Sequence, residues 1–250
     1  MDPSFGANTA HSVLIDGAKQ LGITLSVAQV DRFARFQSIL LDWNQRMNLT
    51  AITDPADVQI KHFLDSLTVL MGIPEPVRTG QQPASLIDVG AGAGLPGIPL
   101  AIVRENLQVA LLEATQKKCR FLGHVIDELG LSNARVICGR AEEIAHLPNQ
   151  RASYDVVVAR AVASLATLAE FCLPLARIGG EVIAMKKLGI VDEVAASKKA
   201  ISTLGGKLLD PVIVKLPGLE EDRQLIRMAK VRPSPAAYPR RAGVPAKSPL

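Results

Sequence analysis

The stretch LIDVGAGAGLPGIPLAI, residues 86–102, decides the fold of this 250-residue chain. Glycines at positions 90, 92, 94 and 97 follow one apolar run and precede a second run that has helical spacing. Glycine is needed where the backbone passes close to a ligand or takes a positive φ. A tight turn that serves packing alone would need fewer glycines. The order strand, glycine-rich turn, helix therefore predicts a ligand-binding loop at the carboxyl edge of an open α/β sheet.

The segments after this loop predict a mostly parallel sheet. Short apolar runs alternate with stretches of helical spacing, which is typical of strands joined by crossover helices. We expect strands at 85–89, 108–113, 134–138, 154–159 and 180–185. We expect helices near 96–104, 116–129, 141–146, 163–177 and 190–204. The runs KLLDPVIVKLP and RQLIRMAKV, joined by GLEED, would then close the sheet with an antiparallel hairpin.

Three regions of different pattern divide the chain. Residues 1–75 are expected to form a helical extension, since Ser26 and Gln29 have capping-box spacing and Asp54 precedes a proline at a second helix start. Residues 85–231 would form the sheet domain. Residues 232–250 are rich in proline and basic residues, without periodicity, and predict an extended tail.

Composition limits the class of protein. Apolar residues make up 48% and charged residues 21% of the chain, which is an ordinary globular balance. No apolar run is long enough to cross a membrane and no secretion signal is visible, so we expect a cytoplasmic protein. The three cysteines, Cys119, Cys138 and Cys172, have neither paired nor metal-type spacing and are expected to be small core residues. The net charge of +4 favours polyanionic partners mildly.

The glycine loop fits two kinds of cofactor. One register spells GxGxxG, the dinucleotide pattern, and the other, from Asp88, spells DxGxGxG, the pattern of adenosylmethionine-dependent methyltransferases. In either register Glu113, at the end of the next strand, would accept hydrogen bonds from ribose hydroxyls. Three features favour adenosylmethionine: a carboxylate at Asp88 for a cationic ligand, a proline at Pro96 where pyrophosphate would need a free N–H, and the closing hairpin.

Two later strand ends complete the predicted cofactor site. The backbone of Ala141 and Glu142, with the carboxylate of Glu142, would meet the adenine in CGRAEEI. Arg160 follows a buried strand, and would contact the cofactor or an RNA phosphate unless it is an ordinary surface arginine.

Several segments together resemble one family. They are WNQRMNLTAI (43–52), HFLDSL (62–67), DVGAGAGLPGIPLAI (88–102), RAEEI (140–144), ARAVASL (159–165) and the tail YPRRAGVPAKSPL. The chain resembles the ribosomal RNA small subunit methyltransferase G family, also called glucose-inhibited division protein B, from about residue 30 to 250. The resemblance implies a Rossmann-like class I methyltransferase fold, with a seven-stranded, mostly parallel sheet, an antiparallel C-terminal strand and an N-terminal helical extension.

The resemblance also implies an activity. A bacterial cytoplasmic enzyme of this family would transfer a methyl group from S-adenosylmethionine to N7 of a guanine in 16S rRNA, at position 527 of the reference numbering. Its cofactor contacts would map onto Gly90, Leu95, Ala141, Glu142 and Arg160, beside the Asp88, Gly92, Gly94 and Glu113 of the loop and strand end. Some members have aspartate at the position of Glu113, and the longer side chain would shift the ribose contact slightly.

Methylation at N7 needs little from the protein except positioning. This nitrogen carries a free lone pair and no proton, so direct in-line attack requires no general base, and orientation supplies much of the catalysis. Candidates for the acceptor side are Asn44, Asn48, Thr50, His62 and Asp65. A structural hydrogen-bond network between two helices explains these residues equally well.

Basic residues beside the cofactor mouth would grip RNA through phosphates. The candidates are Lys117, Lys118, Arg120, Lys186, Lys187, Arg240, Arg241 and Lys247, with Lys230 and Arg232 next to the tail. The tail is expected to add RNA affinity without affecting cofactor binding. The expected partner is 16S rRNA or a small ribosomal subunit, for a monomer without metal. The competing hypotheses are a methyltransferase of a protein or small molecule, and a nucleotide-binding protein without catalysis.

Overall fold

The computed structural model describes residues 11–160, 163–216, 218 and 222–250. Part of the predicted loop GLEED and two residues of the segment ARAVASL lie outside this range. Within it, no helix is long and apolar enough to cross a membrane.

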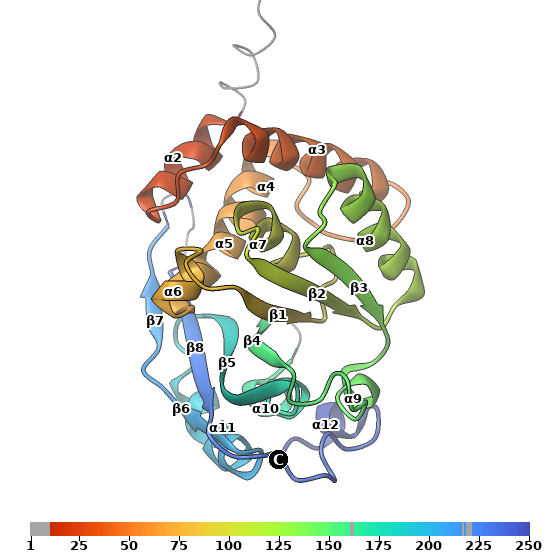
Figure 1. The fold of residues 1–250 in the computed structure, drawn as a ribbon, viewed down its shortest axis with the longest axis vertical. Helices are drawn as coiled ribbons and strands as arrows, with labels where there is room; N and C mark the ends of the chain where they lie inside the picture. Colours follow the sequence, from red (N-terminus) through yellow and green to blue (C-terminus); the bar gives the residue numbers. More distant parts are fainter. Residues whose placement is uncertain (1–10, 161–162, 217, 219–221) are drawn as a thin grey trace, which may run out of the picture.

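A twisted sheet forms the centre of the molecule (Figure 1). Its strands are β1 (Ala84–Val89), β2 (Leu107–Glu113), β3 (Ala134–Cys138), β4 (Tyr154–Arg160), β5 (Ala176–Lys187), β6 (Gly206–Leu208), β7 (Val212–Val214) and β8 (Arg223–Lys230). Their order is β3-β2-β1-β4-β5-β8-β6, with β7 also paired to β8. Strands β1 to β5 pair in parallel, and β8 is antiparallel to β5, as predicted.

The sheet differs from the predicted seven strands at one edge. The expected strand near 207–217 is split into β6 and β7, which pair with opposite ends of β8. Asp210 and Pro211 lie between the two pieces. Proline has no N–H to donate to a ladder, so the edge strand is interrupted there.

Helices cover both faces of the sheet. They are α2 (Ser12–Gln20), α3 (Val27–Asn44), α4 (Pro55–Val58), α5 (Asp65–Leu67), α6 (Glu75–Arg78), α7 (Gly97–Val103), α8 (Gln116–Leu129), α9 (Ala141–Ile144), α10 (Leu165–Cys172), α11 (Val191–Thr203) and α12 (Val244–Lys247). Successive strand residues point to opposite faces, and so Leu86 joins the core under α3, α7 and α8 while Ile87 joins the core under α10 and α11. Figure 1 shows α3 and α8 on one side of the sheet and α10 and α11 on the other.

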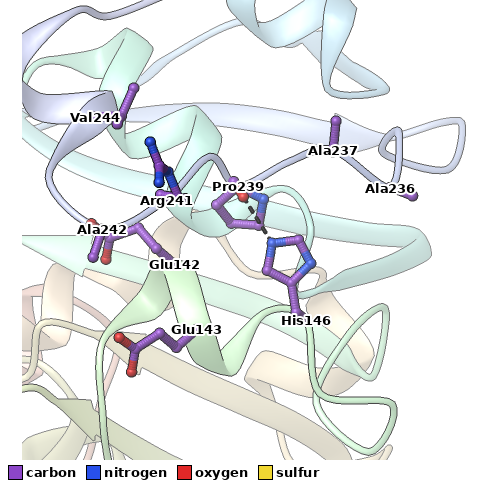
Figure 2. A pocket seen from close by; sticks show the side chains of 9 residues that line it. All are labelled: Glu142, Glu143, His146, Ala236, Ala237, Pro239, Arg241, Ala242 and Val244. Carbon is purple, nitrogen blue, oxygen red and sulfur yellow. Dashed lines mark hydrogen bonds between the residues drawn. The ribbon is translucent and has the colours of Figure 1, made fainter.

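The tail is docked against the domain, and the prediction of an extended tail is wrong. Its segment around Pro239 lies over α9, where the His146 ring makes a hydrogen bond of 2.8 Å to the Pro239 carbonyl (Figure 2). Arg151 donates to the carbonyls of Ser234, Pro235 and Tyr238. Proline-rich segments form no regular backbone ladder, so their carbonyl groups need other hydrogen-bond donors. Side chains of the domain supply these donors.

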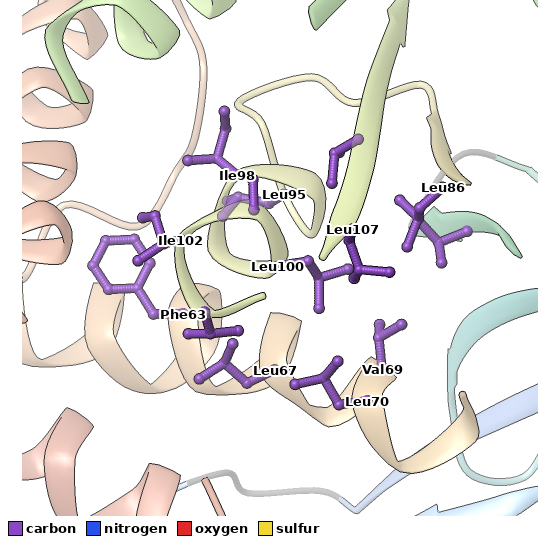
Figure 3. Packing of buried hydrophobic residues seen from close by; sticks show 14 of the residues in the cluster. Phe63, Leu67, Val69, Leu70, Leu86, Leu95, Ile98, Leu100, Ile102 and Leu107 are labelled. Atoms are coloured by element: carbon purple, nitrogen blue, oxygen red, sulfur yellow. The ribbon is translucent and has the colours of Figure 1, made fainter. Parts of the chain in front are cut away.

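The N-terminal helices share one hydrophobic core with α7 and α8. Phe63 stacks with Phe36 at a ring-centroid distance of 5.4 Å, and both are fully buried. Figure 3 shows Phe63 beside Ile102 of α7, with Leu67 in the same cluster. The helical extension therefore packs directly on the helix that follows the glycine loop.

Both predicted helix starts in the extension are confirmed. The Gln29 amide donates to Ser26 Oγ and the Ser26 amide donates to Gln29 Oε1, which completes the capping box at α3. Asp54 caps α4 by accepting two backbone N–H groups. The second helix then departs from α geometry, because a π-helix, η1 (Gln59–Leu64), precedes α5 and a 3₁₀-helix, η2 (Thr68–Gly72), follows it.

Two of the three cysteines are not the isolated core residues that were predicted. Cys119 in the first turns of α8 is disulfide-bonded to Cys138, the last residue of β3, with a Cα–Cα distance of 5.9 Å. Cys138 is exposed. Only Cys172 is a free, buried thiol among the three. The spacing of the pair along the chain gave no indication of this bond, which depends on β2 and β3 being neighbours.

Candidate cofactor and acceptor site

The glycine loop lies between β1 and α7, at the carboxyl edge of the sheet, as its spacing predicted. Gly90 has φ of +77° and is exposed at this edge, so an L side chain there would be strained. Gly97 is required by a close approach, because a Cβ on it would lie 2.2 Å from Leu111 Cδ2 and 2.9 Å from Asp88 Oδ2. The loop backbone is thus exposed to solvent at Gly90, whereas at Gly97 it packs against the core with no room for a side chain.

Asp88 lies under this loop with half of its carboxyl group unpaired. Oδ2 accepts a hydrogen bond of 2.8 Å from the Gly97 amide. Oδ1 is buried and has no hydrogen-bond partner among the residues that the structure describes. Burial raises the pKa of Asp88 to about 7, although the Gly97 amide and the Arg160 charge act in the opposite direction. A buried carboxyl oxygen without a partner suits a cation or a hydrogen-bond donor.

Glu113 ends β2 beside the same loop. Its Oε2 accepts from the Gly92 amide at 3.0 Å and its Oε1 accepts from the Thr115 amide at 2.7 Å. A carboxylate oxygen can accept more than one hydrogen bond, so two backbone donors fix the group and leave capacity for ligand hydroxyls. The strand-end acid is therefore held where the sequence placed a ribose contact.

The tail contacts α9, the helix that follows the carboxyl end of β3. Ala141 and Glu142 open α9, and Glu142 Oε1 accepts from the Gly243 amide at 2.9 Å. A pocket of about 750 Å³ lies between α9 and the tail (Figure 2), lined by Glu142, Glu143, His146, Ala236, Ala237, Pro239, Arg241, Ala242 and Val244. The tail contacts Glu142, a predicted cofactor residue. The expectation that cofactor binding does not depend on the tail stays a prediction.

Asp65 joins two arginines from distant strands. Arg160, at the end of β4, donates through Nη1 to Asp65 Oδ2 at 2.9 Å. Arg223, the first residue of β8, donates through Nε to Asp65 Oδ1 at 2.7 Å. Sequence reasoning missed Arg223, which has no motif around it and reaches the site only through the pairing of β8 with β5. One buried carboxylate between two guanidinium groups gives this three-residue cluster a net positive charge.

His62 belongs to a separate network with Asn44 and Thr50. The ring Nδ1 lies 3.1 Å from the Lys61 carbonyl, which only accepts, so Nδ1 carries the proton and Nε2 accepts from Thr50 Oγ1 at 2.7 Å. Asn44 Oδ1 accepts from the Thr50 amide at 2.9 Å. Burial, followed by the Arg160 charge, lowers the pKa of His62 to about 4. The ring is thus neutral at physiological pH and both of its nitrogens are occupied.

The predicted acceptor residues therefore separate into different environments. Asn44, Thr50 and His62 form the network, Asp65 holds the arginines, and Asn48 is exposed. The η1 π-helix carries His62 and ends directly before Asp65. Single π-turns inside helices are frequent at functional sites, and the residue spacing in this segment does not indicate one.

The basic candidates also separate. Lys117 and Arg120 are exposed at the start of α8, with Lys118 partly buried beside them, and Arg241 and Lys247 are exposed in the tail. Lys186 instead donates to the Ala163 carbonyl and pairs with Glu193. Arg240 makes a two-pronged ion pair with Glu170, which is fully buried, and is not available as a surface RNA contact. Lys230 is also buried, with its Nζ on the carbonyls of Leu173 and Leu204.

Comparison with solved structures supports the fold assignment. The crystal structure of M. jannaschii TYW2 in complex with AdoMet matches with a TM-score of 0.51 and 16% identity, over 68% of this chain and 76% of that one. A predicted O-methyltransferase from Agrobacterium tumefaciens matches with a TM-score of 0.52 and 18% identity, over 68% and 86%. At such identities the likeness concerns the fold, which is that of Rossmann-like methyltransferases.

Comparison with sequences is more specific. The family model described as "GidB: rRNA small subunit methyltransferase G" matches residues 29–226. The ribosomal RNA small subunit methyltransferase G of Roseiflexus sp. (strain RS-1) is 48% identical over 95% of this chain and 99% of its own length. The protein of the same name from Pelotomaculum thermopropionicum is 46% identical over 94% and 96%. The resemblance stated from the sequence motifs is confirmed, and the chain belongs to the rRNA small subunit methyltransferase G family.

Proposed function

We propose that this chain transfers a methyl group from S-adenosylmethionine to N7 of a guanine in 16S rRNA, guanine 527 in the reference numbering. The family supports methylation of small-subunit rRNA, and the choice of N7 comes from the resemblance together with the chemistry of the site. S-adenosylmethionine, when bound, supplies an activated methyl group on a sulfonium centre. We place the enzyme in the cytoplasm, as a monomer acting on rRNA or on the small subunit.

The unpaired oxygen of Asp88 is the observation that supports the cofactor most strongly. A buried carboxylate without a partner is costly unless a cation or donor completes it. A dinucleotide would instead bring pyrophosphate to this loop, and its negative charge would be repelled by Asp88. We assign Asp88 to the ammonium end of the cofactor, Glu113 to the ribose hydroxyls, and the Gly90 to Leu95 backbone, with Gly92 and Gly94, to the loop wall.

The adenine end is assigned to the residues after β3 and β4. The backbone of Ala141 and Glu142 would bind the base, with the Glu142 carboxylate held in place by Gly243. Arg160 donates through Nη1 to Asp65 and to the Lys61 carbonyl, and its Nε and Nη2 make no hydrogen bond with the residues that the structure describes. These donors would contact the cofactor or the target nucleotide. Arg223 would pair with the other oxygen of Asp65.

Direct attack without a general base agrees with the state of the titratable groups. His62 is neutral, but both of its nitrogens are occupied, so it supports the helix that carries Asp65. The protein then acts by holding the purine in line with the donor. Methylation makes the purine cationic, and a nearby carboxylate or carbonyl oxygen would favour that charge.

The RNA surface is proposed from basic residues that are exposed, together with the partly buried Lys118. Lys117, Lys118 and Arg120 follow the carboxyl end of β2, and Lys187 is the last residue of β5, so they lie along the edge that carries the glycine loop. Arg241 and Lys247 extend the surface along the tail. Phosphate contacts of this kind fix register and give salt-dependent affinity, while the flipped base carries the specificity.

One experiment tests the proposal against its alternatives. Small subunits from a strain lacking this gene are incubated with the purified chain and S-adenosylmethionine, and the digested 16S rRNA is analysed by nucleoside and fragment mass spectrometry. We expect one new 7-methylguanosine, which Asp88→Asn reduces strongly and the exposed control Asp127→Asn does not. A methyl group on another base atom would overturn the N7 assignment. No methyl transfer, together with a thermal shift by NAD alone, would favour a nucleotide-binding protein.

A further inference from the structure

We propose that Cys119 and Cys138 form a reversible redox pair that controls the cofactor site, an inference that rests on the proposed function for the identity of the ligand. The two residues belong to α8 and β3, which flank the end of β2. Their Cα atoms lie 5.9 Å apart, within the range that a disulfide spans without backbone movement. The pair therefore requires no rearrangement of the fold to form.

The position of the pair connects it to the cofactor residues. Cys138 is the register partner of Glu113 in the parallel ladder, and the next amide, Gly139, donates to the Glu113 carbonyl at 2.9 Å. On the other side, the Cys119 amide donates to the Thr115 carbonyl at 3.0 Å, and the Thr115 amide donates to the Glu113 carboxylate. The bond thus closes a ring of contacts around the acid assigned to the ribose.

The sulfur atoms of Cys119 and Cys138 have a partner both as a disulfide and as thiols. As a thiol, Cys119 Sγ lies 3.2 Å from the Glu113 carbonyl oxygen, and Cys138 Sγ lies 3.0 Å from Gln116 Oε1. Each acceptor is within reach of an S–H donor. A pair that satisfies its sulfur atoms in either state is suited to switching between them.

The exposure of Cys138 and the position of Cys119 in a helix favour disulfide formation. Cys138 is exposed, so a dissolved oxidant reaches it first, whereas Cys119 is 7% exposed and is reached only through its partner. Cys119 lies in the first turns of α8, next to Lys118 and Arg120, with no acidic residue in the first turn. The attacking species in thiol–disulfide exchange is a thiolate, and a position near the amino end of a helix is the kind of environment that favours one.

The reaction balances with a small disulfide as oxidant. The Cys138 thiolate attacks one sulfur of oxidised glutathione, which forms a mixed disulfide and releases one glutathione thiolate. The Cys119 thiolate then attacks Cys138 Sγ, which forms the protein disulfide and releases the second glutathione. Two thiols of the protein are oxidised, one disulfide of the oxidant is reduced, and the two protons remain with the two glutathiones or the buffer.

The oxidised form is expected to bind S-adenosylmethionine more tightly. The disulfide ties the first turns of α8 to the end of β3, and so the elements that hold Glu113 and Ala141 are ordered before the ligand arrives. Pre-ordering of a site improves affinity by removing the cost of ordering it on binding. We expect about a 3- to 10-fold lower Kd, and a melting temperature higher by about 5–10 °C.

The test uses the full chain in glutathione buffers of varied ratio. Differential alkylation with peptide mass spectrometry measures the Cys119–Cys138 disulfide, and calorimetry measures the Kd for S-adenosylmethionine in each state. Cys138→Ser should lose the redox dependence of the Kd, while Cys172→Ser, which removes the buried third thiol, should keep it. If the pair stays reduced in excess oxidised glutathione, or if both states bind equally, the proposal is overturned. If neither state binds S-adenosylmethionine while the disulfide still forms, the proposed function fails instead.

Discussion

The glycine loop and the surface on which the tail docks each bury a carboxyl group, and the two groups differ in their hydrogen-bond partners. Asp88 under the loop is 1% exposed and leaves one oxygen without a partner among the described residues. Glu170 under the tail is 0% exposed, and Arg240 reaches it with its backbone amide, Nε and Nη2. The incomplete carboxyl is suited to a ligand, and the completed one holds a segment of the chain in place.

The largest expected effect comes from breaking the completed pair. Arg240→Ala leaves a fully buried Glu170 without its cation, and removal of one partner of a buried pair costs about 3–5 kcal/mol. The free energy of unfolding in urea, followed by circular dichroism, should fall by this amount. The neighbouring exposed Arg241→Ala is the matched control and should change it by less than about 0.5 kcal/mol. An equally small loss for Arg240→Ala would mean that the tail does not depend on the pair.

The same acid-to-amide change should have opposite results at the two carboxyl groups. Asp88→Asn should weaken S-adenosylmethionine binding about 10- to 100-fold, the value of one charge-assisted hydrogen bond, with little loss of stability. Glu170→Gln should lower the free energy of unfolding and leave the Kd nearly unchanged. Calorimetry and urea unfolding on both variants measure this. Equal losses of affinity would show that the two sites do not differ as described.

Cofactor affinity should depend on pH through Asp88. Because the pKa of Asp88 is raised to about 7, the carboxyl is largely neutral below that pH and attracts a cation less. The Kd should therefore rise as pH falls from 8.5 to 5.5, by up to about tenfold per unit below 7. His62, with its pKa lowered to about 4, stays neutral over this range and contributes nothing. Asp88→Asn should give a flat profile, and a slope that survives this change would assign the effect to another group.

Stability should show the reverse trend with pH at the same residue. A carboxyl whose folded pKa is raised holds its proton in the folded state, so its contribution is complete below the unfolded pKa near 4 and is lost as pH rises to about 7. The difference in unfolding free energy between Asp88→Asn and the unchanged chain should therefore shift in favour of the variant from pH 5 to pH 8. A constant difference would contradict the raised pKa.

The smallest expected effect concerns rRNA affinity. Arg241→Ala, beside the paired Arg240, should weaken rRNA binding only a few-fold and reduce the slope of log K against log salt by about 0.7–0.9, the value of one phosphate contact. Filter binding at several salt concentrations gives the slope. An unchanged slope would remove Arg241 from the RNA surface.

Sequence patterns predicted the features that are local in the chain. The glycine loop, the strand-end acids and the two helix starts each depend on residues within a few positions of one another, and each was found where expected. The parallel order of β1 to β5 followed from the alternation of strands and helices. The family resemblance placed the same residues in a site before any geometry was available.

The features that escaped prediction depend on distant partners. Arg240 looks like a surface cation until Glu170, 70 residues earlier, is placed beneath it. Arg223 becomes part of the site only because β8 inserts next to β5. Cys119 and Cys138 meet because β2 and β3 are neighbours, and their spacing resembles no disulfide or metal motif. Local spacing carries no information about such pairings.

The pairing of Asp65 with Arg223, 158 residues later, has a consequence for synthesis of the chain. As the polypeptide leaves the ribosome, the helices around Asp65 emerge long before β8. Among the strands that the structure describes, β6 and β7 pair only with β8. A nascent chain therefore reaches residue 222 with one arginine on Asp65 at most and an open sheet edge. Formation of β8 covers the edge of β5 and brings the second arginine to Asp65. We expect a product truncated before β8 to keep an exposed β5 edge and to be prone to aggregation and proteolysis.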